Sequence, residues 1–270
     1  MKPAIDNIEK YLDGIEEDGK KCVSQDLFDC LRFDHVSFKI GDTKEFILED
    51  ININFEKNKK YAIVGSSGSG KTTLLRLILG LYKDIQGNIL ANTENLKNIS
   101  LTEWRKGITM VEQDIFLFND SIKYNICFKK ENSYADLREL INLVGLGDFV
   151  SSKDENVEYI LDENGANISG GEKKRLAMAR ALYKQSKIIL ADEPTSGLDA
   201  TNAKLIEDIL VNSKQMVINI THNLDKEVLQ RYDEIICMQN GKISGIGDYE
   251  TLYSQNMYFR GLCEDFKSEI

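Results

Sequence analysis

Long apolar runs, paired cysteines and excess positive charge are all missing from this sequence. Its 270 residues contain no window of 18 apolar residues, so we expect no membrane-spanning helix in the chain. The first residues, MKPAIDNIE, carry acids where a secretory signal needs an apolar stretch. The formal charge of −10 and the pI near 4.9 leave no large basic surface, which makes nucleic acid an unexpected partner.

The cysteines are few and scattered. They number five, which is odd, and no C-x-x-C pair occurs, so we expect reduced thiols in a cytosolic compartment: Cys22, Cys30, Cys127, Cys237 and Cys263. Apolar residues make up 42% of the chain, enough for a proper core. The length allows one large α/β domain or two smaller ones.

One unbroken run, GSSGSGKTT, matches the pattern G-x-x-x-x-G-K-S/T of a P-loop. The apolar segment 61–64 before it has the length of a strand, and 73–79 after it is apolar at helical spacing, as the motif requires. Glycines let several backbone N–H groups point at one phosphate chain at the positive end of the helix. We expect a Lys charge at the terminal phosphates, a Thr hydroxyl on Mg²⁺, and nucleotide contacts from Gly65, Ser66, Ser67, Gly68, Ser69, Gly70, Lys71, Thr72 and Thr73.

The apolar pattern predicts strands that alternate with helices. Segments 31–40 and 46–55 alternate apolar and polar residues and are expected to pair antiparallel. Between 121 and 165 the strand signals stop, and 135–144 has the pattern of an amphipathic helix. We expect an α/β fold: a P-loop NTPase core with a mainly parallel sheet, an antiparallel β subdomain and an inserted helical subdomain. Further strands are predicted at 87–90, 108–111, 188–192, 217–220 and 234–238, the last turning into a hairpin at Asn240-Gly241.

Polar side chains follow several of these strands. Gln113, Asp192, Glu193 and His222 all lie at strand ends, where parallel sheets bind their ligands. Beside a P-loop, we expect Asp192 to hold Mg²⁺ and Glu193 to orient a water. Without that neighbour, an Asp-Glu pair is more often a pair of solvated loop acids, and a histidine more often a satisfied loop residue.

The segment Ile168-Ser-Gly-Gly-Glu172 precedes a helix predicted from Lys173 to Lys184, whose start can hold a phosphate. Together with the motifs above it makes the sequence, from about Leu31 to Phe259, resemble the nucleotide-binding domain of an ABC transporter. The resemblance implies ATP and Mg²⁺ as ligands and a head-to-tail dimer, in which Ser169 and Gly171 of one domain close over ATP on the other. It implies that the signature motif consists of Ser169, Gly170, Gly171 and Glu172. Gln113 would be the Q-loop glutamine, with a catalytic role, and would also bind the metal together with Thr72 and Asp192. Glu193 would be the catalytic glutamate, His222 the switch histidine and Asp199 the D-loop aspartate.

Finer features are similar to ABC exporters. The stretches 111–126 and 162–165 resemble the corresponding exporter segments, and an amphipathic stripe within 3–21 resembles the end of the last transmembrane helix, although a helix packed on this domain fits equally. We therefore expect a domain cut from a longer exporter, at the cytoplasmic face of the cell membrane, with a transmembrane domain and a second nucleotide-binding domain as partners. The expected division is a linker at 1–30, an ATPase core at 31–120 and 166–270, and a helical subdomain at 121–165.

Two other functions stay open at this point. A soluble ABC-type ATPase acting on nucleic acid or ribosomes would usually carry two cassettes, a long insertion or a basic surface. An importer ATPase would begin close to its first strand and lack the exporter-like stretch at 111–126.

The sequence departs from the family pattern at two positions. Glu172 stands where the signature usually has Gln, which adds a negative charge near a phosphate site. Ile40 stands where an aromatic residue should stack on adenine, and an aliphatic side chain does not provide that contact. The expectation is weak base selectivity unless Phe38 or Phe46 substitutes.

Overall fold

The computed structural model describes residues 25–41, 45–128, 134–154 and 156–268. The helix predicted within 3–21 lies outside these residues, as does most of the predicted linker. None of the helices in the described part of the chain combines the length and apolarity that a membrane span needs.

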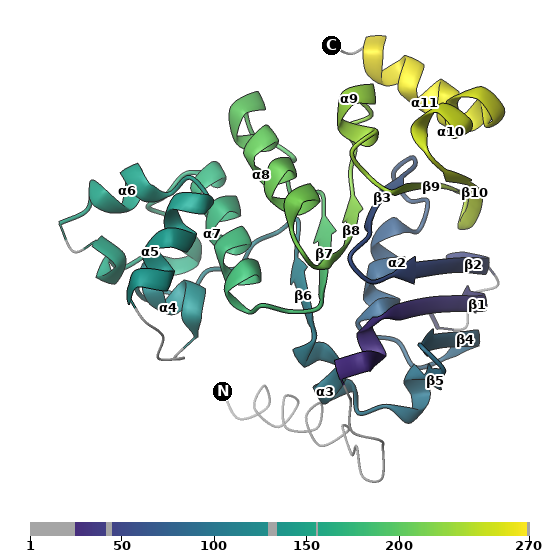
Figure 1. Cartoon of the computed structure of the whole chain (residues 1–270), viewed down its shortest axis with the longest axis horizontal. Coiled ribbons are helices and arrows are strands. Elements are labelled where there is room, and N and C mark those ends of the chain that lie inside the picture. The colour runs from purple at the N-terminus through teal and green to yellow at the C-terminus, as the bar shows by residue number, and fades with distance from the viewer. Residues whose placement is uncertain (1–24, 42–44, 129–133, 155, 269–270) are drawn as a thin grey trace.

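Two sheets form the framework (Figure 1). The smaller is antiparallel, in the order β2-β1-β4-β5: Leu48–Glu56, Cys30–Phe38, Ile85–Ala91 and Glu94–Asn95. The larger has the order β10-β9-β3-β8-β7-β6, with all neighbours parallel except the β9–β10 hairpin: Lys242–Gly247, Glu234–Gln239, Lys60–Val64, Met216–Ile220, Ile188–Asp192 and Ile108–Val111. The predicted fold class is confirmed, including the antiparallel pairing of the first two strands.

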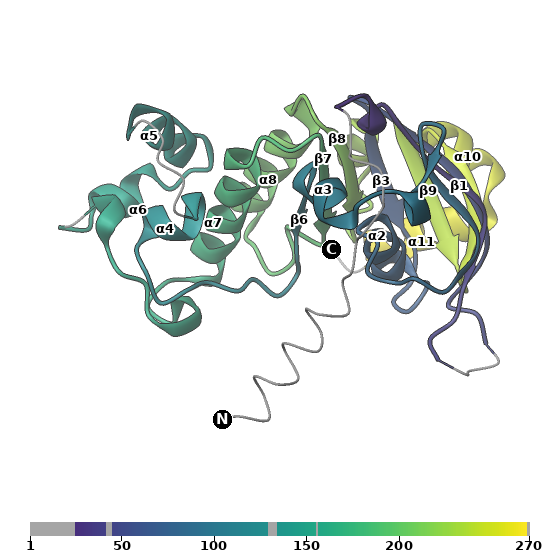
Figure 2. The same ribbon diagram turned by 90° about the horizontal axis from the view of Figure 1, so that it is seen from below.

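Helix α2 (Lys71–Ile78) lies between the two sheets (Figure 2). Its buried leucines share one apolar cluster with Phe33 and Ile51 of the small sheet and Ile63 of the large one. Strands β3, β7 and β8 are buried along their whole length, which explains their continuous apolar sequences. The helix that starts at the P-loop is therefore fixed on both sides by packed strands.

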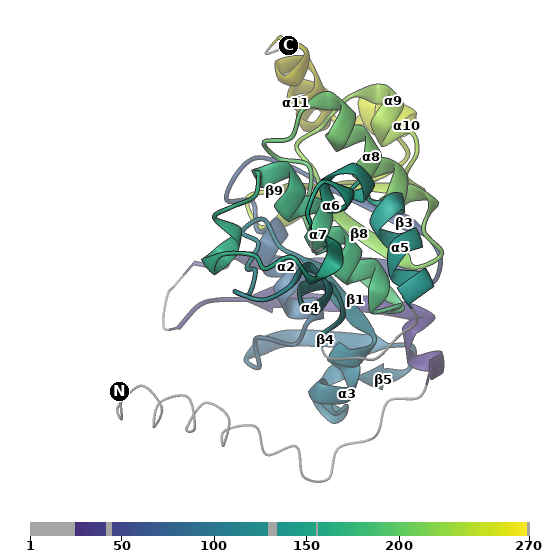
Figure 3. The same ribbon diagram turned by 90° about the vertical axis from the view of Figure 1, so that its left-hand side faces the viewer.

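The segment predicted as a helical insertion contains short helices and no strand of either sheet among its described residues: α4 (Ile122–Cys127), α5 (Tyr134–Leu143), α6 (Gly147–Ser151) and the 3-10 turns η3 (Asn156–Glu158) and η4 (Glu163–Gly165). With α7 (Gly170–Tyr183) they pack around a second apolar cluster that includes Ile141, Leu176 and Ile206. Figure 3 shows α4, α5, α6 and α7 together in front of the large sheet.

Helix α7 begins earlier than predicted, at Gly170 instead of Lys173. The Ser169 hydroxyl accepts a hydrogen bond from the Glu172 N–H, and the Glu172 carboxylate accepts one from the Ser169 N–H. This capping box compensates for two glycines in the first turn, which are poor helix formers. The remaining elements are η1 (Gln25–Phe28), η2 (Leu96–Asn98), α3 (Leu101–Lys106), α8 (Ala200–Asn212), α9 (Lys226–Leu229), α10 (Tyr249–Gln255) and α11 (Met257–Ser268).

Helix α3 holds the carboxyl end of α2. The Trp104 indole is fully buried and stacks on Phe28, with the two ring centroids 4.8 Å apart. Its Nε1–H donates a hydrogen bond to the Ile78 carbonyl oxygen at 2.7 Å. Arg105 donates to the carbonyls of Leu79 and Gly80. Carbonyls that a helix end leaves without partners are thus satisfied by two side chains of one neighbouring helix.

We predict that Trp104→Ala lowers the free energy of unfolding by about 3–5 kcal/mol, because it leaves a large cavity and an unpaired carbonyl. Urea unfolding followed by far-ultraviolet circular dichroism measures the change. Leu143→Ala, at a leucine that is 55% exposed, is the control and should change stability by less than about 0.5 kcal/mol. Equal losses from both variants would contradict the proposed role of Trp104.

Candidate functional site

The predicted P-loop lies between β3 and α2, and two of its glycines have no room for a side chain. Gly65 has φ +147°, and a Cβ there would lie 2.2 Å from the Met238 carbonyl oxygen. Gly70 has φ +99°, and its Cβ would lie 2.6 Å from the Leu48 side chain. The loop is therefore pressed between the ends of β9 and β2, and only glycine fits both positions.

The Lys71 ammonium is buried at the centre of the loop. It donates to the carbonyl oxygens of Gly65 at 2.7 Å and Ser66 at 3.0 Å. Burial lowers its pKa, while the carboxylates of Glu193 and Asp192 act in the opposite direction. Within the described residues, two of its three N–H donors bind these neutral carbonyls, and an anionic ligand can accept from the ammonium as well.

Asp192, the last residue of β7, is 5% exposed, and its Oδ1 atom has no hydrogen-bond partner among the described residues. Burial raises its pKa, and a hydrogen bond with the Thr72 side chain partly offsets this. A buried oxygen without a partner beside a hydroxyl fits a hard cation such as Mg²⁺. In the described part of the chain no cluster of three or more His, Cys, Asp or Glu could hold a metal by itself, so a cation here needs further ligands, such as water or phosphate oxygens.

The Glu193 carboxylate contacts side chains that follow the strands on either side of its own. Its Oε2 accepts a hydrogen bond from Gln113 Nε2 at 3.2 Å, and its Oε1 lies 2.7 Å from His222 Nε2. Because an ionised carboxylate only accepts, the proton of this second bond belongs to the histidine. Gln113 follows β6, Glu193 follows β7 and His222 follows β8, so the sheet order itself brings them together. Glu193 has φ +50°, a conformation that few residues other than glycine adopt.

The predicted signature segment is not next to the P-loop of its own chain. Ser169 and Gly170 are exposed at the start of α7. This helix packs with Ile189 of β7 on one face of the large sheet, whereas α2 packs with Ile188 on the other face. The Glu172 carboxylate binds the Ser169 N–H and hydroxyl, both at 2.7 Å. Asp199 caps the start of α8 through the Asn202 N–H.

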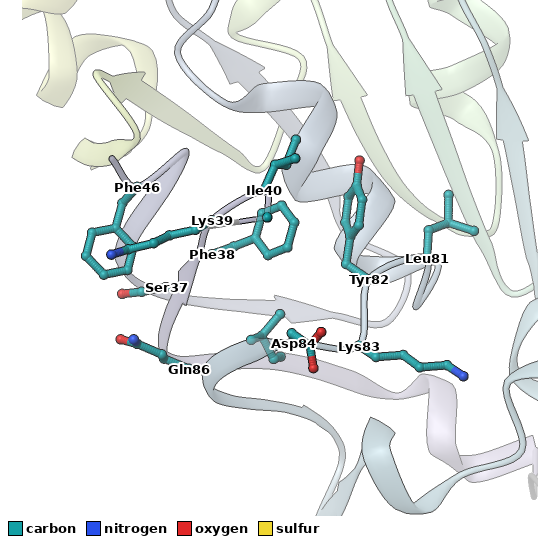
Figure 4. Close-up of a pocket in the computed structure, with 12 residues that line it drawn as sticks. Ser37, Phe38, Lys39, Ile40, Phe46, Leu81, Tyr82, Lys83, Asp84 and Gln86 are labelled. Atoms are coloured by element: carbon teal, nitrogen blue, oxygen red, sulfur yellow. The ribbon is translucent and has the colours of Figure 1, made fainter. Parts of the chain in front are cut away.

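The cavity at the predicted base position has a volume of about 690 Å³ (Figure 4). Ile40 is 52% exposed at its rim. Phe38 is buried and packs on Tyr82 with ring centroids 4.5 Å apart, so it is not available to a base. Phe46 is half-buried, and the Lys39 ammonium lies 4.1 Å from its ring centroid. Of the two aromatic substitutes considered from the sequence, only Phe46 has an accessible ring.

Sequence reasoning missed Lys174. Its ammonium donates to the carbonyl and the hydroxyl of Ser196, and lies 3.5 Å from the Glu193 carbonyl oxygen. The start of α7 is thereby tied to the loop that carries the candidate catalytic carboxylate. A lysine on the predicted helix gave no signal, because its partners lie about 20 residues away in a loop.

Comparisons with known proteins agree with this geometry. A family model described as ABC transporter matches residues 48–196. The chain is 32% identical over 253 residues to an ATP-dependent lipid A-core flippase of Ralstonia nicotianae, covering 91% of the chain and 42% of that relative. It is 36% identical over 228 residues to the mitochondrial iron-sulfur clusters transporter ABCB7 of Danio rerio, covering 82% of the chain and 30% of that relative. A bacterial Atm1-family ABC exporter with ATP bound superposes with a TM-score of 0.84 at 28% identity, covering 92% of this chain and 43% of the other. The chain spans less than half the length of these relatives.

We predict that Lys71→Ala weakens ATP binding by roughly 10- to 100-fold, since charged hydrogen bonds to phosphate are lost and no backbone N–H replaces the charge. Isothermal titration calorimetry measures the Kd. Lys106→Ala removes an exposed lysine of α3 and should bind ATP like the parent protein. Unchanged affinity in Lys71→Ala would rule out the P-loop assignment.

We also predict that GTP binds almost as well as ATP, because Ile40 provides no stacking surface. Ile40→Tyr should tighten ATP binding by roughly 5- to 100-fold, the worth of one stacked base. Ile160→Tyr, at a residue that is 49% exposed and distant in sequence, is the matched control. A strong ATP preference in the parent protein that disappears in Phe46→Ala would show instead that Phe46 supplies the stacking.

Proposed function

Because the chain belongs to the ABC transporter family, we propose that it binds and hydrolyses ATP and so powers export across a membrane by ATP-driven head-to-tail dimerisation. One observation carries the proposal: Gln113 and His222 both bond the Glu193 carboxylate beside a P-loop and a buried, unsatisfied Asp192. Phosphoryl transfer needs this set of parts, namely a phosphate cradle, a cation ligand and a group that orients water.

Each residue has a separate task in this proposal. The loop amides and Lys71 would bind the phosphates. Asp192, Thr72 and Gln113 would hold Mg²⁺, which would neutralise charge on the phosphate oxygens. Glu193 orients the attacking water and receives its proton. His222 donates from Nε2 to Glu193, which fixes the carboxylate in one orientation.

The exposed start of α7 supports a second copy as the missing half of the site. Ser169 and Gly170 are exposed, and α7 and α2 pack on opposite faces of the large sheet, so these two residues are free to meet the nucleotide held by another chain. A helix start with a serine hydroxyl and two glycines suits a phosphate. We therefore assign the signature segment to the ATP of the partner, in a homodimer or a heterodimer.

The membrane function rests on the relatives. The flippase and the exporter named above are longer than this chain, and we propose that their additional length corresponds to a transmembrane domain that this ATPase serves at the cytoplasmic face of the membrane. The division into a linker, a core and a helical subdomain from 121 to 165 belongs to the same proposal. The acidic charge of −10 favours it over a role on nucleic acid. Six membrane helices encoded upstream in the reading frame would support it, and their absence would favour an importer or a soluble ATPase.

We predict that Glu193→Gln lowers kcat by roughly 10²- to 10⁴-fold and leaves the Kd for ATP nearly unchanged. The amide keeps the shape and the hydrogen bond from His222 but loses the charge that takes a proton from water. Phosphate release measures turnover and calorimetry measures binding. A variant that hydrolyses ATP at the parent rate would remove Glu193 as the base.

The same variant tests the shared site. With ATP and Mg²⁺ it should elute as a dimer in size-exclusion chromatography, and without nucleotide as a monomer. Adding Ser169→Arg should return it to a monomer, because the new side chain blocks the facing phosphate. A dimer that survives Ser169→Arg would contradict the head-to-tail arrangement.

A further inference from the structure

The C-terminal helix α11 contacts the P-loop directly. The Tyr258 hydroxyl oxygen lies 3.0 Å from the Ser66 backbone nitrogen and 3.0 Å from the Ser66 hydroxyl. The Ser66 N–H donates to the tyrosine, and the tyrosine O–H donates to the serine hydroxyl. These residues are 192 positions apart in the sequence, and the matched family model ends at residue 196.

The contact fixes one particular peptide plane. The Ser66 N–H and the Gly65 carbonyl belong to the same planar peptide group, so the orientation of one sets the orientation of the other. Tyr258 binds the N–H, and Lys71 binds the carbonyl at 2.7 Å. The peptide is thus held at both of its polar ends, and the tyrosine hydroxyl is linked to the Lys71 ammonium through it.

The orientation of the Gly65–Ser66 peptide depends on hydrogen bonds from outside the loop more than that of the neighbouring peptides does. Gly65 has φ +147°, and glycine has the widest choice of backbone conformations, so the peptide after it can rotate where no partner restrains it. Ser66, Ser67 and Gly68 are exposed and not packed in the core. A rotation would turn the Gly65 carbonyl away from Lys71 and change the shape of the phosphate cradle.

Core packing fixes the position of helix α11, which carries Tyr258. Phe259 and Cys263 are fully buried in a cluster with Leu252 and Ile235, and Tyr258 packs partly against the same cluster. The Asn256 side chain accepts a hydrogen bond from the Phe259 N–H at the start of the helix. The hydroxyl therefore reaches Ser66 from a ring whose position is set by core packing.

We propose that Tyr258 is a positioning residue for nucleotide binding, which holds the Gly65–Ser66 peptide in the conformation that receives the phosphates. The inference rests on the proposed ATP-binding function and extends it to the C-terminal helix. Tyr258 would act by preorganisation. The loop already populates its bound conformation, so nucleotide binding needs less ordering of the loop.

The test is Tyr258→Phe, which removes one oxygen and keeps the ring. Titration calorimetry with ADP and with a non-hydrolysable ATP analogue should show a Kd about 3- to 10-fold weaker, the value of one or two ordinary hydrogen bonds. At saturating ATP, kcat should stay within about twofold, since Tyr258 touches no reacting group. Tyr253→Phe is the matched control, because Tyr253 packs on Tyr249 and Arg260.

Ser66→Ala separates the two hydrogen bonds and leaves α11 unchanged. It removes only the serine hydroxyl, so the N–H still reaches Tyr258, and the Kd should change less than in Tyr258→Phe. In the Ser66→Ala background, Tyr258→Phe should still weaken binding. Thermal unfolding without nucleotide shows for each variant whether the fold has weakened.

An unchanged Kd in Tyr258→Phe, with or without a lower melting temperature, would overturn the inference and leave Tyr258 with a structural role only. Tighter binding would also overturn it, because the hydroxyl would then compete with phosphate for the Ser66 N–H. A parent protein that binds no adenine or guanine nucleotide would overturn the proposed function as well, so the two failures are distinguishable.

Discussion

The backbone ladder of the parallel sheet is the constraint on which the site depends. Adjacent strands lie about 4.8 Å apart, so residues that follow neighbouring strands in the same direction come within reach of one another. The ladder continues past the strand ends, where the Glu193 N–H donates to the Ile220 carbonyl and the Thr221 N–H to the Ile63 carbonyl. Gln113, Glu193, His222 and the P-loop consequently meet at one edge, although more than 150 residues separate the first loop residue from the histidine.

The polar groups at that edge are not balanced by the protein alone. The Lys71 ammonium donates hydrogen bonds to neutral carbonyls, and one carboxylate oxygen of Asp192 has no hydrogen-bond partner among the described residues. Burial shifts the pKa of each toward its uncharged form, lowering that of Lys71 and raising that of Asp192. A phosphate chain with a divalent cation would supply a partner of opposite charge to each of them. The folded state therefore tolerates electrostatic cost at the place where a ligand can remove it.

The sequence predicts the local features well, because glycine spacing, apolar runs and strand-end polar residues depend on near neighbours in the chain. The P-loop, the mainly parallel sheet and the meeting of Glu193 with His222 follow from these patterns. The sequence pattern does not predict features that depend on residues far apart in the chain. The side chains of Trp104 and Arg105 that hold the end of α2, the bond between Tyr258 and Ser66, and the burial of Phe38 against Tyr82 all need the tertiary packing. The early start of α7 was visible in principle, since Ser169 and Glu172 have the spacing of a capping box.

The separation of the signature segment from the P-loop has a consequence for mixed assemblies. In the proposed head-to-tail pair each nucleotide would use the P-loop of one chain and the signature segment of the other. When a chain altered at Lys71 is paired with a chain altered at Ser169, both lesions fall on the same nucleotide, and the second nucleotide meets only intact residues. Two chains that would each be inactive as homodimers would therefore restore one working site when they are combined, as in genetic complementation between two defective alleles.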